Sequence, residues 1–375
     1  MSPFRLSTVL HIASALSLGL CAAIPAANAQ QVPEIKVVRI ATGPTDSTLF
    51  PFGGLIGNAI SNPPGSRPCD RGGSCGVPGL IATAQTTGGP LDNLRAVARG
   101  DIELGLSDSD IAEWVYRGSY EFEGQEPLNR LRLIAQLYPA TLHLIARKAA
   151  KITSVKDLAG KTVAVDGEGT GTRYTARVVL AAYDVPWDAV TMKTLDLTAA
   201  PAAFKAGEID AMFVIGGTPV LALSDLARAD PFDVIPIDGP TAEKIAQVLP
   251  YYTVDQIPAD AYAGVPATPT LAVGAVLVAR DDMSDDLAFG IARAIWHERN
   301  ASLFAAGHPR GKLMSKARAA GDLRLPLHPG AARYYIAQGI IAPPAETPAA
   351  ETPAPQPDQP AAKPAAPARA ASAAP

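Results

Sequence analysis

Apolar and polar positions follow two alternating patterns along the chain. Short apolar runs bounded by turn residues are typical of buried strands, and between them apolar residues return every three or four positions, as in helices. The strands are predicted at residues 35–40, 80–84, 103–106, 163–165, 211–215 and 232–236. The helices are predicted at residues 53–61, from 90 onward, at 111–116, 154–160, 241–248 and 285–304. This alternation predicts an α/β fold.

Two apolar runs, residues 131–146 and 268–279, are too long for one ordinary strand. We interpret each as a strand that crosses from one lobe to another, and two crossings make a hinge. The crossings predict a discontinuous lobe 1, at residues 30–147 and 264–342, and a lobe 2 at residues 148–263.

A short sequence echo supports two lobes. Residues 98–103 and 205–210 both combine a helix end, a glycine cap and an acidic entry to a strand. Each strand ends in a polar or glycine-rich turn, and open α/β sheets bind ligands at the carboxyl ends of their strands. A hinge with facing turns predicts a cleft that closes on a ligand.

Residues 161–180 contain the first candidate ligand contact. A predicted strand ends in a glycine-rich turn at residues 167–172, and a helix follows. The free N–H groups at a helix start carry partial positive charge, and glycine lets a ligand approach them closely. Arg173 in the first turn opposes the helix dipole unless an anion is near. We expect this turn to hold a small carboxylate; the alternative is an ordinary strand-to-helix connection.

The two ends of the chain differ in composition from the rest. Residues 1–29 have a positive charge at Arg5, an apolar run and an A-x-A site that ends at Ala29, which predicts a cleaved export signal and a periplasmic protein. A retained membrane anchor and lipidation at Cys21 are the alternatives. Residues 343–375 are rich in proline and alanine, which predicts a disordered tail.

Net charge and the two cysteines bear on which partners and which kind of cysteine site the chain can have. The chain carries a net charge of −4, and removal of the predicted signal with Arg5 leaves −5 (−4 minus 1). We find no basic patch for nucleic acid and no basic amphipathic helix for lipid. Cys69 and Cys75 flank a short glycine loop, which in an oxidising compartment favours a disulfide over a metal site, since zinc wants four ligands.

A search for catalytic sets finds none, so we expect a binding protein without cofactor or metal rather than an enzyme. The five histidines are scattered and none forms H-E-x-x-H. The glycines at 167–171 form neither a P-loop nor a G-x-G-x-x-G motif.

In order along the chain, several segments together resemble the TAXI family of solute-binding proteins, which serve tripartite ATP-independent periplasmic (TRAP) transporters. The segments are ATGPTDSTLFP, TTGGPLDNLRAVARGDIELGLSDSD, LRLIAQLYPATLHLIAR, SVKDLAGKTVAVDGEGTGTR, FKAGEIDAMFVIGGTPV and LPLHPGAARYY. The resemblance implies a two-lobe periplasmic binding protein fold of type II-like topology. It also implies a receptor that delivers a carboxylate, glutamate-like or dicarboxylate, to a TRAP permease in the membrane.

The resemblance and the polar turns together give the candidate ligand-binding residues. They are Thr42, Gly43, Thr45, Asp46, Ser47, Phe50, Thr87, Gly88, Asp108, Tyr138, Gly169, Thr170, Gly171, Thr172, Arg173, Gly216 and Gly217. One departure matters, because the family's first turn is usually richer in glycine and here carries Asp46 and Ser47. An added carboxylate could repel an acidic ligand or pair with an amino group.

Three hypotheses remain open at this point. In the first, an exported receptor binds a small carboxylate through Arg173 and the amides of 169–172, so that Arg173→Ala weakens binding strongly. In the second, the cleft is an enzyme site with Asp108 or Asp46 as base. In the third, the protein signals to a membrane partner and the tail is a tether.

Overall fold

The computed structural model describes residues 35–321 and 323–343. The predicted export signal and nearly all of the predicted tail lie outside these residues. Within the described ranges, no helix combines the length and the apolar character needed to cross a bilayer.

Among the described residues, ten strands form one mixed sheet in the order β4-β1-β5-β12-β6-β9-β7-β8, with β10 paired to β6 and β11 paired to β12. The strands are β1 (Lys36–Ala41), β4 (Leu80–Gln85), β5 (Leu104–Asp108), β6 (Leu131–Arg147), β7 (Thr162–Val165), β8 (Thr191–Thr194), β9 (Ala211–Gly216), β10 (Phe232–Val234), β11 (Tyr252–Ile257) and β12 (Thr268–Arg280). A separate pair consists of β2 (Ser61–Asn62) and β3 (Val77–Pro78).

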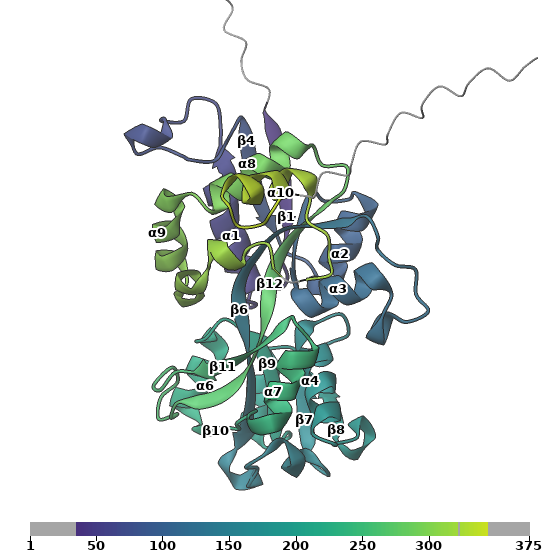
Figure 1. The fold of residues 1–375 in the computed structure, drawn as a ribbon. Coiled ribbons are helices and arrows are strands. Elements are labelled where there is room, and N and C mark those ends of the chain that lie inside the picture. Colours follow the sequence, from purple (N-terminus) through teal and green to yellow (C-terminus); the bar gives the residue numbers. More distant parts are fainter. Residues whose placement is uncertain (1–34, 322, 344–375) are drawn as a thin grey trace, which may run out of the picture. The chain divides into compact units, whose positions relative to one another are not determined.

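The helices pack against this sheet in two groups (Figure 1). They are α1 (Leu49–Ile60), α2 (Pro90–Arg99), α3 (Ser109–Arg117), α4 (Gly171–Ala182), α5 (Ala200–Ala206), α6 (Leu221–Ala229), α7 (Gly239–Val248), α8 (Asp285–Ile295), α9 (Glu298–Gly307) and α10 (Pro329–Ala337). We call β1, β4 and β5 with α1–α3 and α8–α10 the first half. The second half contains β7–β11 and α4–α7.

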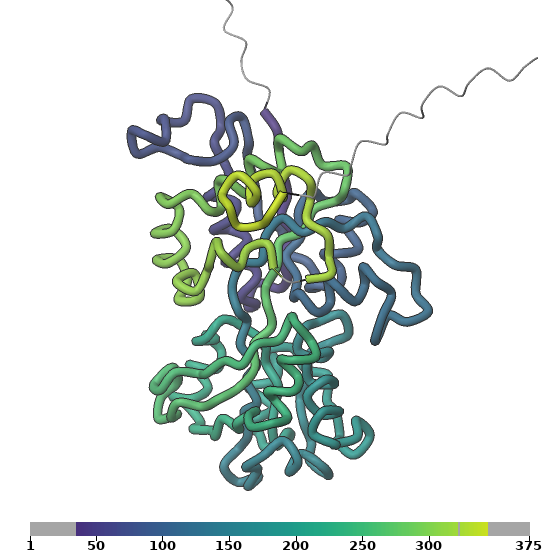
Figure 2. Tube along the Cα trace, in the orientation of Figure 1, coloured from purple at the N-terminus to yellow at the C-terminus, as the bar shows by residue number. Residues whose placement is uncertain are grey.

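The strands β6 and β12 run through both halves and pair with each other in antiparallel fashion. At one end β12 pairs with β5 of the first half, and at the other end β6 pairs with β9 and β10 of the second half. Figure 2 shows by colour that early and late segments of the chain share the first half, whereas its middle forms the second. This confirms the predicted fold class, a two-lobe α/β fold with two crossing strands; the exact lobe boundaries stay a prediction.

Both crossing strands are almost entirely buried, which explains their continuous apolar sequence. Pro139 is tolerated inside β6 because the register shifts there, between the pairs Gly274↔Pro139 and Val276↔Gln136. Tyr138 therefore lies on a crossing strand, between the two halves.

Two helix predictions are wrong in detail. The helix predicted at 285–304 is two helices, α8 and α9, because His297 has an extended backbone and its side chain accepts a hydrogen bond from Arg299 N–H as the N-cap of α9. The segment at 154–160 makes only a 3₁₀ turn, Val155–Leu158, which begins with a capping box of Ser154 and Asp157.

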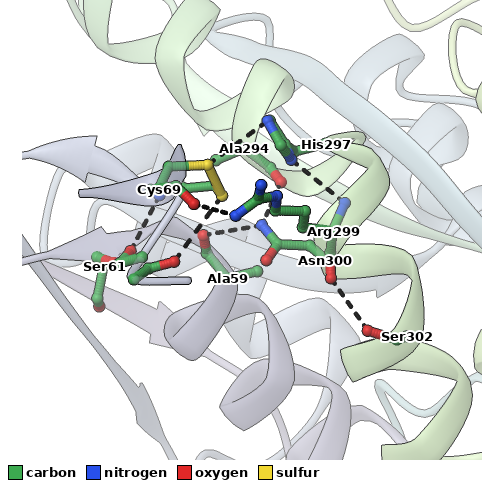
Figure 3. Close-up of a disulfide and its surroundings, with 12 residues drawn as sticks. Ala59, Ser61, Cys69, Ala294, His297, Arg299, Asn300 and Ser302 are labelled. Carbon is green, nitrogen blue, oxygen red and sulfur yellow. Dashed lines mark hydrogen bonds between the residues drawn. A yellow bond between two sulfur atoms is a disulfide. The ribbon is translucent and has the colours of Figure 1, made fainter. Parts of the chain in front are cut away.

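The predicted disulfide between Cys69 and Cys75 is present and closes the loop between β2 and β3 (Figure 3). The loop contacts α9, where Arg299 donates to the carbonyl of Cys69. The next residue of α9, Asn300, donates to the carbonyl of Ala59 in α1 at 3.3 Å. His297 Nε2 lies 3.7 Å from Cys69 Sγ. Since the two sulfurs are bonded to each other, this cluster does not offer the thiolates that zinc would need.

Candidate functional site

A narrow cavity of about 100 Å³ lies where the first half, the second half and β6 meet. Residues of the first half line one side and residues of the second half line the other. Ten of the predicted site residues contribute to the lining: Gly43, Asp46, Ser47, Gly88, Asp108, Tyr138, Thr170, Gly171, Thr172 and Gly216. The structure therefore brings together polar turns from both halves.

Seven predicted residues do not line the cavity: Thr42, Thr45, Phe50, Thr87, Gly169, Arg173 and Gly217. Two of the hydroxyls are used within the first half. Thr42 Oγ1 donates to the carbonyl of Gln85 at 2.8 Å, and Thr87 Oγ1 donates to Asn93 Oδ1 at 2.5 Å. These threonines hold the turns in place instead of facing a ligand.

Arg173 is the largest departure from the sequence-based site. Its guanidinium carbon lies 5.5 Å from the ring centre of Trp187, and its Nη2 lies 3.8 Å from Glu168 Oε1. Both partners belong to the second half, and Arg173 is absent from the cavity lining. In this geometry the guanidinium cannot take an anion held in the cavity.

The two halves touch around the cavity. Gly217 N–H donates to Thr48 Oγ1 at 2.8 Å, and Thr198 Oγ1 donates to Asp46 Oδ2 at 3.3 Å. On another side Leu91 N–H donates to the carbonyl of Gly169 at 3.2 Å. Gly217 and Gly169 thus contribute through contacts between the halves, in a closed arrangement.

The Asp108 carboxylate enters the cavity from the end of β5. Asp108 is only 4 % exposed, and within the described part of the chain its carboxylate has no hydrogen-bond partner. It lies against the start of α4: a Cβ added at Gly171 would come within 1.9 Å of Asp108 Oδ2. Burial raises the pKa of the Asp108 carboxyl well above its usual range, and the nearby charge of Asp110 raises it further.

Tyr138 forms the wall of the cavity on β6. Its ring stacks on Phe52 of α1, with centroids 3.9 Å apart and planes inclined by 24°. Its hydroxyl is buried and finds no partner among the residues that the structure describes. Burial raises the pKa of this hydroxyl well above its usual range, so it stays protonated. Asp108 and Tyr138 thus both line one cavity, and each carries a polar group without a partner among the described residues.

Three further carboxylates line the cavity, and each of them already accepts a hydrogen bond from another residue of the protein. Gly167 N–H donates to Asp166 Oδ1 at 2.6 Å. Asp196 Oδ1 accepts the N–H groups of Thr198 and Ala199, and Asp46 accepts the Thr198 hydroxyl described above. None of the described residues that line the cavity is a lysine, arginine or histidine.

Helix starts supply the positive potential that cationic side chains do not. The first residues of α1, α2, α4 and α5 line the cavity: Leu49, Pro90, Gly171 and Ala200. Pro90 has no N–H, and the N–H groups of Leu91 and Ala200 already donate to the carbonyls of Gly169 and Asp196. The first N–H groups of α1 and α4 are the ones that can direct partial positive charge at a solute. The cavity thus combines four carboxylates with the N-termini of α1 and α4.

Part of the lining was missed from the sequence. The loop that precedes α5 contributes Leu195, Asp196 and Leu197, and Phe213 and Val214 of β9 add an apolar wall. Asp166, directly after the strand at 163–165, fits the same strand-end pattern as the predicted residues. The loop at 195–197 follows β8, a strand that its sequence TMKT did not reveal.

Comparisons with known proteins find several solved structures of low similarity. The aliphatic sulphonate binding protein SsuA from Escherichia coli is 14% identical, with 73% of this chain and 79% of that chain covered and a TM-score of 0.42. An ancestral arginine-binding protein is 15% identical, with coverages of 72% and 97% and a TM-score of 0.43. The ligand-binding component of an ABC-type import system from Staphylococcus aureus is 11% identical, with coverages of 83% and 94% and a TM-score of 0.45. At TM-scores below 0.5 these likenesses carry no argument about this chain.

A family comparison is more decisive. The sequence profile of the NMT1-like family matches residues 40–339, about four fifths of the chain. The matched region contains both crossing strands and every residue that lines the cavity. The profile does not distinguish the TAXI family, which stays a resemblance. The chain belongs to the NMT1-like family.

Proposed function

We propose that the protein is an exported solute-binding protein whose two halves close on a small solute and deliver it to a membrane permease. The observation that carries the proposal is the cavity between the halves, in which the Asp108 carboxylate and the Tyr138 hydroxyl lack partners. Two crossing strands that join the halves fit an opening and closing motion.

The energetics of the closed cavity support ligand binding. A buried polar group without a hydrogen-bond partner costs about 1–3 kcal/mol. A solute that satisfies Asp108 and Tyr138 removes this cost only when the halves are closed. It therefore favours the closed state over the open one, which is what a hinged receptor requires.

The solute is small, because the cavity measures about 100 Å³. The TAXI resemblance makes a carboxylate, glutamate-like or dicarboxylate, the first class to test. Helix N-termini around the cavity favour an anionic group, whereas the four carboxylates oppose one. We propose that the cavity-lining residues of the predicted set contact the solute, and that Arg173 acts outside the site.

The recipient that we propose is a TRAP permease, on the strength of the TAXI resemblance alone. Export to the periplasm follows from the predicted signal at residues 1–29. Solute uptake that needs this protein, continues after ATP depletion and stops when the ion gradient is collapsed would support this partner. Uptake that stops with ATP depletion while the gradient is intact would contradict it.

The receptor function is tested by thermal denaturation of the protein purified from the periplasm, with dicarboxylates and amino acids added one at a time. A solute that binds only the folded state stabilises it by about 2.7 kcal/mol at a concentration of 100 times Kd. We expect at least one compound to raise the melting temperature in a saturable way.

The variant Tyr138→Phe tests whether the solute binds in the cavity. It removes only the unpartnered hydroxyl, so the empty protein should lose no stability while solute affinity falls about fivefold to tenfold. Tyr116→Phe is the matched control, since Tyr116 does not line the cavity. Unchanged affinity in Tyr138→Phe would remove this cavity from the proposal, and a screen without any stabilising compound would contradict the receptor function itself.

A further inference from the structure

We propose that the solute carries a primary ammonium group and that the Asp108 carboxylate, with the Tyr138 hydroxyl as a second acceptor, selects it. The inference rests on the proposed receptor function and names the chemical class of its solute. It makes the cavity selective for small amines, including amino acids, and against simple mono- and dicarboxylates.

The charges of the cavity lining point to a cation. Asp46 and Asp108 come from the first half, and Asp166 and Asp196 come from the second. No lysine, arginine or histidine of the described chain lines the cavity, and Arg173 is held by Trp187 and Glu168 outside it. A simple dicarboxylate would add negative charge to this set, whereas an ammonium group is attracted by every member of it.

Hydrogen bonding singles out Asp108 among the four carboxylates. The other three accept hydrogen bonds from backbone N–H groups or from the Thr198 hydroxyl. The Asp108 carboxylate accepts no hydrogen bond from any described residue, although Asp108 is only 4 % exposed. A carboxylate buried this far needs a donor or a positive charge, and an ammonium group supplies both.

Tyr138 complements this acceptor. Its hydroxyl oxygen can accept one ammonium hydrogen, and stacking on Phe52 fixes the ring that carries it. An ammonium group has three donors, so a carboxylate and a hydroxyl facing one small cavity suit it well.

The helix starts explain why amino acids are included in the class. The N-terminus of the twelve-residue helix α4 lies directly beside Asp108, because a Cβ at Gly171 would come within 1.9 Å of Asp108 Oδ2. A carboxylate attached to the same solute can use this helix end while its ammonium group uses Asp108. A solute that has a carboxylate but no ammonium group would leave the Asp108 carboxylate without a counterion.

One competing chemistry uses the same residue. If the buried Asp108 carboxyl kept its proton, it could donate a hydrogen bond to an acidic solute, much as an amide does. Asp108→Asn separates the two, because asparagine keeps a donor and the shape but cannot carry the negative charge. An ammonium solute loses its counterion in this variant, whereas an acidic solute keeps its donor.

The test measures binding by calorimetry with matched pairs of compounds: L-glutamate with glutarate, L-alanine with propionate, and putrescine with 1,4-butanediol. We expect at least one amine to bind, its partner without the amine to bind about a hundredfold more weakly, and Asp108→Asn to weaken the amine about a hundredfold. Asp225→Asn is the matched control, since it removes one negative charge from α6 at a residue that does not line the cavity.

The remaining outcomes separate this inference from the receptor function. Glutarate or propionate that binds as tightly as its amine partner overturns the ammonium inference and leaves the receptor function standing. Full amine affinity in Asp108→Asn overturns the role of Asp108 in the same way. Binding of no compound from either side of the pairs, together with a negative thermal screen, overturns both.

Discussion

Gly171 lies against the Asp108 carboxylate so closely that no larger residue fits without moving it. A Cβ at this position would come within 1.9 Å of Asp108 Oδ2 and 2.8 Å of its Cγ. We therefore predict that Gly171→Ala turns the carboxylate away from its place and lowers solute affinity about tenfold or more, with a smaller effect on the melting temperature.

The control for this variant is Gly167→Ala in the same turn. A Cβ at Gly167 would meet nothing within 4 Å, and its backbone is not in the left-handed region. Calorimetry on the two variants gives the comparison. Equal affinity in both would show that the Asp108 position beside α4 does not matter for binding.

At this scale the sequence identified polar turns but not the direction of their side chains. Asp108 and Gly171 could be predicted because strand ends of an α/β sheet meet at one edge. Arg173 lies only two residues after Gly171, yet its side chain packs against Trp187, because successive helix residues point about 100° apart. The direction of each side chain depends on how the helix is rotated against the sheet. Residue types and their spacing in the sequence do not determine this rotation.

At the scale of elements, α3 of the first half is bound to the second half by a buried carboxylate. Tyr252 of β11 donates to Asp110 Oδ2 at 2.7 Å, and Thr175 of α4 donates to the same oxygen at 3.4 Å. Burial raises the pKa of Asp110 from 3.8 to about 6, against the lowering effect of these hydrogen bonds.

This raised pKa predicts how stability depends on pH. Between about pH 4 and pH 6 the folded protein holds a proton at Asp110 that the unfolded chain has lost, so each rise in pH favours unfolding. We expect the free energy of unfolding to fall by about 1 kcal/mol per pH unit in this window through Asp110, with the raised pKa of Asp108 acting in the same direction.

Denaturant unfolding at several pH values measures the effect. Asp110→Asn should flatten the slope between pH 4 and pH 6, because asparagine does not titrate. Asp225→Asn, at an exposed position, should keep it. A slope that is the same in Asp110→Asn and in the unchanged protein would contradict the role given to Asp110.

The elements themselves were predictable to different degrees. The crossing strands β6 and β12 were recognisable because strands buried on both faces are continuously apolar. The strand β11 was not, since its sequence YTVDQI mixes charged and apolar positions and its pairing with β12 is a contact far along the chain. The break between α8 and α9 depends on a histidine cap, a rare N-cap residue that periodicity does not reveal.

At the scale of the whole molecule, a few contacts across the cavity hold the two halves together. The hydroxyl of Thr48 accepts the N–H of Gly217 at 2.8 Å, next to the solute position. We predict that Thr48→Val, which keeps the shape and removes the acceptor, increases the solute dissociation rate about fivefold and changes the association rate little.

Stopped-flow kinetics with the best-binding solute check this prediction. Thr83→Val is the matched control, because Thr83 is exposed on β4 and does not line the cavity. A dissociation rate equal to that of the unchanged protein would mean that this contact does not hold the halves together.

The position of Asp108 links the proposed hinge motion to the pKa of this residue. Asp108 precedes α3 in the first half, and its carboxyl lies beside the start of α4 in the second half. We expect the opening motion proposed above to return that carboxyl to water, which would lower its pKa towards the usual range. The pKa of Asp108 would then depend on the angle between the halves, and we expect the number of protons taken up on closing to depend on whether a cation enters with the solute.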